Sequence, residues 1–384
     1  MPTHPIANRS KWLAVGLTLF VGCAKPQIDI PGVDLPNLPG LSSPEPDEFF
    51  YNWLEHSNRT WVGPQFWANR LQDWRLQDGR LECASGRLPY RTLHLLSHRI
   101  SPGRGNLRIG IRLGLTGLAS EKGAEAGFLI GAGSAELDYR AASLIQSAPG
   151  PEGGLLAGVD AEGRLFLKDF STPPQGQSTE SLSTSKQPIA QMSAGTLDDI
   201  TDLRLFLQIE EMQPLEPAVA SDKESEELEK EAVLNVSEDG NPLYRITLAA
   251  YKSETLLSMD EEEDEEPQYL RMREPLAEIG IEGVSGERLA GNLALFANQQ
   301  GAIEGEAPPQ FWFRDWHGRG FKLSEHSGHH FGPILCAQHT LSRGVLKMTA
   351  QLPPLADEDY GILLLQTKQD AQWTDVATAE VVQP

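Results

Sequence analysis

A β-hairpin signal at residues 74–83 constrains the fold of this chain more than any other stretch. Its sequence is Trp-Arg-Leu-Gln-Asp-Gly-Arg-Leu-Glu-Cys, in which apolar and polar residues alternate on both sides of an Asp-Gly pair. An Asp-Gly pair between two alternating segments favours a two-residue turn. The alternation directs the apolar side chains to a core and the charged ones to water. We therefore expect this stretch to open an antiparallel sheet.

The same alternation recurs along the chain. It is cleanest at 107–113, where every second residue is Leu or Ile. Further strands are expected at 91–99, 155–159, 164–168, 203–209, 244–248, 289–297 and 310–316, as a pair at 128–133 and 139–145, and as a strand or short helix within 47–61. The 36 glycines and 27 prolines suit short strands joined by turns. The pattern predicts an all-β sandwich or jelly roll.

The first 23 residues are typical of an export signal. Arg9 and Lys11 precede an apolar run of about ten residues, which is too short to span a bilayer as a stable helix. The run ends in Phe-Val-Gly-Cys, which resembles a bacterial lipobox, so Cys23 is the expected lipidation site. The alternatives are an ordinary signal peptide with an incidental cysteine, or a short anchor. Lipidation followed by Ala24 predicts a cell-envelope lipoprotein, held on the outer membrane if the usual sorting rule applies.

Residues 24–46 are predicted to form a tether that keeps the chain extended, because prolines are dense there. The prolines are Pro26, Pro31, Pro36, Pro39, Pro44 and Pro46. Beyond the tether two cysteines remain, Cys83 and Cys336. They either pair in an oxidising compartment or are buried thiols.

The formal charge of −22 argues against nucleic acid as a partner, because so acidic a surface repels polyanions. The charge is uneven, since 16 acidic and 4 basic residues lie between Asp222 and Glu266. We expect two solvated acidic insertions, 211–242 and 258–268, the first with a short helix. The run 260–266 lacks the glycine turn and the spacing of an EF-hand loop, so a calcium site there is the weaker alternative.

Several short motifs, taken in order, resemble those of a concanavalin/laminin-G-type jelly roll. They lie in the opening hairpin and at 127–131, 139–142, 158–166 and 291–295. Together with 311–316, 331–335 and 341–347, their order is similar to the N-terminal, non-catalytic region of exported alkaline phosphatase D-like (PhoD-type) proteins. The resemblance covers roughly 48–384, and the two acidic insertions depart from it.

The resemblance implies a jelly roll over 47–320, then a linker and a partial fibronectin/immunoglobulin-like segment over 321–384. Strands of that segment are expected at 345–352, 361–366 and 373–382. Three strands are fewer than the seven of a complete immunoglobulin-like sandwich. Either they pack on the jelly roll, or the rest of the domain is missing through truncation or a split gene.

No catalytic site, metal site or cofactor site is predicted. Asp315-Trp316-His317 imitates the opening Asp-x-His motif of a metallophosphatase, but too few residues follow for the catalytic core, and Asp315 falls at the end of an expected strand. We interpret His94 and His98 as surface residues. A loose histidine cluster is read as a polar linker rather than a zinc site, which needs three or four supported ligands. Its members are His326, His329, His330 and His339.

The expected function is a lipid-anchored binding or accessory module with a saccharide as its candidate ligand. The resemblance implies saccharide binding on a concave sheet face, through aromatic side chains and polar hydrogen bonds. The candidates are Trp61, Trp67, Trp74, Trp312 and Trp316, although a tryptophan in such a position is more often a core residue than a binding platform. One alternative is the N-terminal part of a metallophosphatase or phosphodiesterase whose catalytic domain is missing or lies on a separate chain. Another is a purely structural envelope protein.

Overall fold

Two antiparallel sheets, each of eight strands, form the body of the computed structural model. The structure describes residues 45–53, 58–84, 90–116, 124–145, 152–170, 190–191, 197, 199–212, 241–253, 274–299, 310–353, 355, 362–369 and 371–382. The predicted signal with Cys23, most of the tether, most of the first acidic insertion with its expected helix, and all of the second insertion lie outside these residues.

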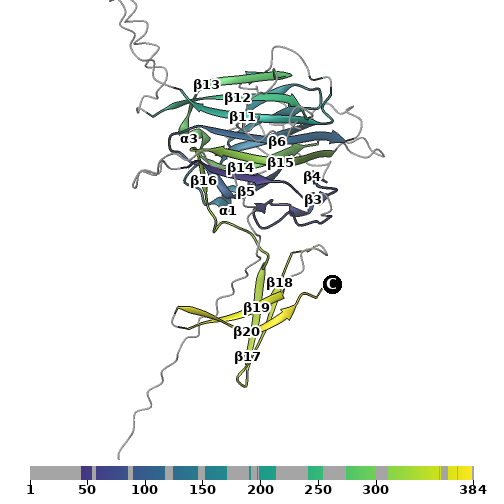
Figure 1. Cartoon of the computed structure of the whole chain (residues 1–384), viewed down its shortest axis with the longest axis vertical. Coiled ribbons are helices and arrows are strands. Elements are labelled where there is room, and N and C mark those ends of the chain that lie inside the picture. Colours follow the sequence, from purple (N-terminus) through teal and green to yellow (C-terminus); the bar gives the residue numbers. More distant parts are fainter. Residues whose placement is uncertain are drawn as a thin grey trace, which may run out of the picture. The chain divides into compact units, whose positions relative to one another are not determined.

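Sheet A has the order β13-β12-β11-β6-β15-β4-β3, with β1 paired to β15. Figure 1 shows β13, β12, β11, β6 and β15 side by side in that order. Its strands are β1 (Asp47–Tyr51), β3 (Trp74–Gln77), β4 (Arg80–Cys83), β6 (Leu107–Thr116), β11 (Leu203–Glu211), β12 (Leu243–Lys252), β13 (Ala277–Ser285) and β15 (Gln310–Gly320).

Sheet B has the order β10-β9-β8-β7-β14-β5-β16, with β2 paired to β5. Its strands are β2 (Phe66–Trp67), β5 (Arg91–Ile100), β7 (Glu125–Ala132), β8 (Leu155–Asp160), β9 (Leu165–Asp169), β10 (Ala190–Gln191), β14 (Gly291–Asn298) and β16 (Leu323–Glu325). Three short helical turns complete this part: η1 (Leu71–Asp73), α1 (Tyr139–Ala142) and α3 (Gly286–Leu289). The chain passes repeatedly between the two sheets, as in a jelly roll, so the predicted fold class is confirmed.

The opening hairpin forms as expected. Strands β3 and β4 pair Trp74 with Cys83 and Gln77 with Arg80. The turn residues Asp78 and Gly79 both have positive φ, 51° and 70°, as a type I′ turn requires. Trp74 and Cys83 are buried in the core. No disulfide joins Cys83 to Cys336, which is exposed on β17.

Some expected elements differ in the structure. The segment 139–145 is not a strand, because Asp138 caps a helical turn by accepting a hydrogen bond from the Arg140 backbone N–H. The strands β2, β10, β13, β16 and β17 were not expected. The alternation in Ala-Glu-Ile-Gly-Ile-Glu-Gly-Val (277–284) is the signal that identifies β13.

The C-terminal strands form two separate hairpins: β17 (Cys336–Ser342) with β18 (Val345–Gln351), and β19 (Ile362–Gln369) with β20 (Gln372–Glu380). The described residues fall into two compact units, 45–353 and 355–382. The first contains both large sheets and β17–β18, and the second contains β19–β20. A fibronectin/immunoglobulin-like identity for these hairpins stays a prediction. No helix among the described residues is long and apolar enough to cross a membrane.

The inner faces of sheets A and B share one hydrophobic core. The outer face of sheet B is buried as well, under a second apolar cluster of Leu129, Ala132, Leu156, Phe166, Phe170, Ala294 and Phe296. Ile145, which follows α1, packs against this cluster. Strands β7 and β14 are therefore buried along their whole length, as strands covered on both faces are.

His94 lies beneath Ile145 on the outer side of sheet B and is fully buried, so its expected surface position is wrong. His98, which is 6% exposed, is also not a surface residue. The His94 Nε2 donates to the Ile145 backbone oxygen at 3.2 Å. Burial lowers the pKa of His94 to about 4, because the site disfavours the charged imidazolium.

We predict that His94 makes the fold sensitive to acid. Its pKa is lower in the folded than in the unfolded chain, so its contribution is present above about pH 6.5 and is lost as the pH falls toward 4. Urea unfolding of wild type should lose about 3 kcal/mol more free energy of unfolding across this range than unfolding of His94→Gln. The exposed His339→Gln is the matched control. Equal pH slopes for wild type and His94→Gln would contradict the prediction.

Candidate functional site

The outer face of sheet A is the candidate functional surface, because the outer face of sheet B is covered by its own apolar cluster. On sheet A the inward positions of β11 and β12 are Leu, Ile, Tyr and Ala, and the outward positions are mostly polar or charged. Strand pairing arranges the outward residues in rows that cross the sheet.

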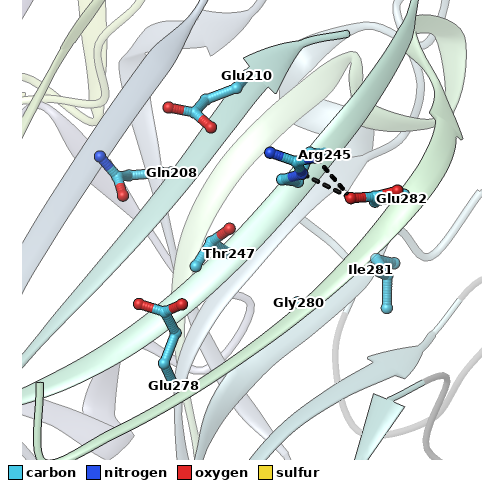
Figure 2. A pocket seen from close by; sticks show the side chains of 8 residues that line it. All are labelled: Gln208, Glu210, Arg245, Thr247, Glu278, Gly280, Ile281 and Glu282. Carbon is cyan, nitrogen blue, oxygen red and sulfur yellow. Dashed lines mark hydrogen bonds and ion pairs between the residues drawn. The ribbon is translucent and has the colours of Figure 1, made fainter. Parts of the chain in front are cut away.

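An open groove of about 570 Å³ crosses β11, β12 and β13 on this face (Figure 2). It is lined by Gln208, Glu210, Arg245, Thr247, Glu278, Gly280, Ile281 and Glu282. One cross-strand row places Gln208 opposite Thr247, and Thr247 opposite Gly280. Because Gly280 has no side chain, the row leaves space above β13.

The groove contains more hydrogen-bond acceptors than its one cationic side chain, Arg245, can pair with. Arg245 donates to Glu282 at 2.7 Å, and the pair lies at one side of the groove (Figure 2). Within the described part of the chain, Glu210 and Glu278 have no ion-pair or hydrogen-bond partner. The pKa of the neighbouring Tyr251 is raised, first by burial and then by the negative charge of Glu278. The groove thus presents carboxylate, amide, hydroxyl and guanidinium groups on rigid strands.

An aromatic row lies beside the groove. Phe206 of β11 is opposite Gly110 of β6, and Gly110 is opposite His317 of β15. The rings of Phe206 and His317 meet edge-on at 5.7 Å above Gly110, where an added Cβ would approach His317 to 2.4 Å. The Arg108 guanidinium lies 4.7 Å from the Phe206 ring centroid, a cation–π distance. Phe206 is 6% exposed, so this row supports the surface and offers no open stacking face.

The tryptophan candidates do not gather at one site. Trp74 and Trp316 are fully buried between the sheets, and Trp61 and Trp312 are 5% and 6% exposed. Trp316 packs edge-on to Phe49 at 5.5 Å. Trp67 keeps intermediate exposure on β2 of sheet B, where it meets Phe331 edge-on at 4.1 Å. Trp74 and Trp316 belong to the core between the sheets. Trp61 and Trp312 are buried but are not members of that core cluster, and the Arg112 guanidinium lies 5.8 Å from the Trp312 ring centroid. Ligand binding by Trp61, Trp67 and Trp312 stays a prediction.

The Asp315-Trp316-His317 segment does not form an opening metallophosphatase motif. It lies within β15, not at its end, and a β-bulge between Arg314 and His317 interrupts the pairing with β6. Asp315 faces the guanidinium groups of Arg204 and Arg314. His317 Nδ1 donates to the Asp315 backbone oxygen at 2.9 Å. Burial lowers the His317 pKa, and the charges of Arg204 and Arg108 act in the same direction.

Two of the histidines after β15, His326 and His329, stack on neighbouring rings. His329 stacks on Tyr139 at 3.7 Å and on His326 at 4.6 Å, with nearly parallel planes in both pairs. Parallel stacking does not direct ring nitrogens to a common point, as metal ligation needs. Within the ranges that the structure describes, no group of three or more His, Cys, Asp or Glu side chains is placed to hold a metal ion.

No protein-family model matches the chain, and no curated protein matches it. Solved structures do resemble it. The carbohydrate recognition domain of Emp47p has a TM-score of 0.38 at 11% identity, covering 73% of this chain and 98% of that domain. Arcelin-5, a lectin-like defence protein from Phaseolus vulgaris, has 0.36 at 8%, covering 72% and 99%. The exoplasmic/lumenal domain of VIP36 in its Ca²⁺- and mannose-bound form has 0.34 at 9%, covering 75% and 89%. At TM-scores this low, the fold assignment rests on the strand pairing of this chain itself. We transfer no ligand from these proteins to the chain.

We predict that Trp316→Ala is far more destabilising than Trp67→Ala. The Trp316 ring is fully buried, so truncation leaves a large cavity and costs about 3–5 kcal/mol of unfolding free energy. The Trp67 side chain is partly exposed, so its truncation should cost clearly less unfolding free energy. Guanidinium unfolding followed by far-UV circular dichroism measures both. A Trp316→Ala variant as stable as wild type would show that the ring is not part of the core.

Proposed function

We propose that the chain is an extracytoplasmic binding module that holds a saccharide in the groove of β11–β13. The observation that carries the proposal is the groove's array of uncommitted acceptors beside one guanidinium. Sugar hydroxyls are donors and acceptors together, and carboxylates accept their strongest hydrogen bonds. Few but fixed polar groups in a depression are what orients a small ligand.

The geometry favours recognition by hydrogen bonds. The residues that line the groove include no aromatic ring, so a sugar there is held by its hydroxyls and not by stacking. Glu278 projects from β13, the edge strand of sheet A, and Glu210 projects from β11, the third strand from that edge (Figure 2). Strand-borne groups need little reordering on binding, which lowers the entropic cost of the complex.

Glu278→Ala and Glu210→Ala should each weaken saccharide binding about tenfold or more, because each removes a charged acceptor. A glycan array with the purified chain selects the ligand, and isothermal titration measures its dissociation constant. Glu136→Ala, an exposed carboxylate near α1 and remote in sequence from the groove, is the matched control and should bind as wild type does. Equal loss in all three variants, or no glycan bound by wild type, would refute the groove as the site.

The membrane address belongs to the same proposal and is supported by the sequence. Acyl chains on Cys23 hold the module at the cell envelope, on the outer membrane according to Ala24. In detergent phase separation the full-length chain should enter the detergent phase, and Cys23→Ala should stay in the aqueous phase. Cys336→Ala, which alters an exposed thiol, should still enter the detergent phase. Detergent partitioning of Cys23→Ala would contradict lipidation at this residue.

The alternative relation to alkaline phosphatase D-like proteins rests on motif order in the sequence. Since Asp315 and His317 face arginines, we assign no catalysis to this chain. A metallophosphatase on a separate chain would then be a partner that the module carries. Co-purification of such a chain with the tagged module tests this alternative, and its absence would leave the binding module on its own.

A further inference from the structure

The chain leaves β16 through a short segment that belongs to no strand, residues 326–331, which we call the strap. Its sequence is His-Ser-Gly-His-His-Phe. Backbone hydrogen bonds hold the strap at both ends. The His326 N–H donates to the Ser97 oxygen of β5, and the Phe331 N–H donates to the Pro64 oxygen just before β2, each at 2.7 Å. The two ends of the strap are therefore fixed to β5 and to the chain that leads into β2.

Stacked rings hold the middle of the strap. His329 stacks on Tyr139 of α1, with ring centroids 3.7 Å apart and planes 7° apart. It also stacks on His326, with centroids 4.6 Å apart and planes 4° apart. We call Tyr139, His329 and His326 the ring stack. Because one member belongs to α1 and two belong to the strap, the ring stack fastens the strap to α1.

An aromatic contact completes the attachment of the strap. The rings of Phe331 and Trp67 meet edge-on with centroids 4.1 Å apart, an arrangement that aromatic pairs prefer. Trp67 lies on β2 and has intermediate exposure. The strap thus shields part of the Trp67 ring, and departure of the strap would expose more of it.

The ring stack favours neutral imidazoles. Burial is the first cause that lowers the pKa of His326 and of His329 below its ordinary value. The charge of His326 lowers the pKa of His329 further, since two imidazolium rings 4.6 Å apart repel each other. Within the part of the chain that the structure describes, the buried Nδ1 of His329 has no hydrogen-bond partner, so a proton added there would lack an acceptor.

Cations on two neighbouring elements also oppose protonation of the ring stack. The guanidinium of Arg99, on β5, lowers the pKa of His326 and of His329. The guanidinium of Arg140, on α1, lies 5.5 Å from the Tyr139 ring centroid. An imidazolium in the ring stack would therefore face like charge from β5 and from α1.

Two carboxylates act in the opposite direction. Asp47 of β1 raises the pKa of His326, and Asp138, which caps α1, raises that of His329. Each carboxylate already accepts a hydrogen bond at 2.9 Å, Asp138 from the Arg140 guanidinium and Asp47 from a backbone N–H of β16. Both histidine pKa values are lowered overall, so these carboxylates do not compensate for burial and like charge.

A third histidine lies close to the strap but outside the ring stack. His98 of β5 is 6% exposed, and its Nδ1 lies 3.0 Å from the Ser97 Oγ. Burial lowers the pKa of His98, whereas the charges of Glu325 and Asp47 raise it. Because His98 belongs to the sheet, an experiment on the strap must separate its titration from that of the ring stack.

We propose that the strap is an acid-released regulatory device, in which protonation of His326 and His329 separates the ring stack, frees residues 326–331 from α1 and uncovers Trp67. The docked strap binds protons more weakly than the released strap, because both pKa values are lowered on docking. Docking is therefore favoured above about pH 6.5 and is lost as the pH falls through the lower pKa values of the docked state. Histidine clusters act as pH switches in this way, and the device does not depend on the groove of β11–β13.

Hydroxyl-radical footprinting of the purified full chain at pH 7.5 and 5.0 tests the release, with mass spectrometry to locate the oxidised side chains. Oxidation of Trp67 and of Phe331 should each rise about twofold or more at pH 5.0, as the released strap becomes the major state. The exposed Phe50 calibrates the radical dose, and the buried Trp316 reports general unfolding. Unchanged oxidation of Trp67, or an equal rise at Trp316, overturns the device.

A variant that keeps the rings but takes up no proton identifies the sensor. The double variant His326→Phe, His329→Phe retains planar rings for stacking. Oxidation of Trp67 in this variant should stay at the wild-type pH 7.5 level at both pH values. His330→Phe alters an exposed neighbour outside the ring stack and should respond to acid as wild type does. A folded double variant that still responds to acid, for example through His98, overturns the proposal.

Tyr139→Ala provides an independent test that does not need the double variant to fold. It removes the ring on which His329 stacks and changes no charge at neutral pH, so the strap should be loosened already at pH 7.5. Oxidation of Trp67 at pH 7.5 should then rise about twofold, to the level of wild type at pH 5.0, while Trp316 stays protected. Oxidation of Trp67 equal to that of wild type at pH 7.5 would show that the ring stack does not hold the strap.

Discussion

Strand β15 carries the constraint on which both the core and the candidate surface depend. It pairs with β6, β4 and β1 in the middle of sheet A, so its side chains must fit neighbours on both sides. A regular strand would send Trp316 and Arg314 to the same face. The bulge adds one residue, which lets Trp316 fill the core while Arg314 and Asp315 both reach the outer face. Burial of one large ring thus stabilises a strained Asp conformation that serves the surface.

The outer faces of sheets A and B differ in the polarity of their side chains. Sheet B carries apolar side chains on both faces, and Ile145 packs against the apolar cluster on its outer face. Sheet A keeps polar outward residues, and the glycines of β6 let neighbouring rings and guanidinium groups lie low across the strand. Gly110 is one such position, since a side chain there would collide with His317 and Phe206.

Alternation in the sequence was sufficient for the fold class and most of the long strands, because a period of two reports directly which residues face a core. The hairpin at 74–83 and the strand at 107–113 illustrate this. Alternation could not predict the groove, nor the three arginines that lie opposite one another on sheet A. Arg204, Arg112 and Arg314 are far apart in sequence, and only the register of β11, β6 and β15 sets them opposite one another. The surface position expected for His94 is wrong for a related reason, because alternation cannot show that Ile145, which follows α1, covers His94 on the outer side of β5.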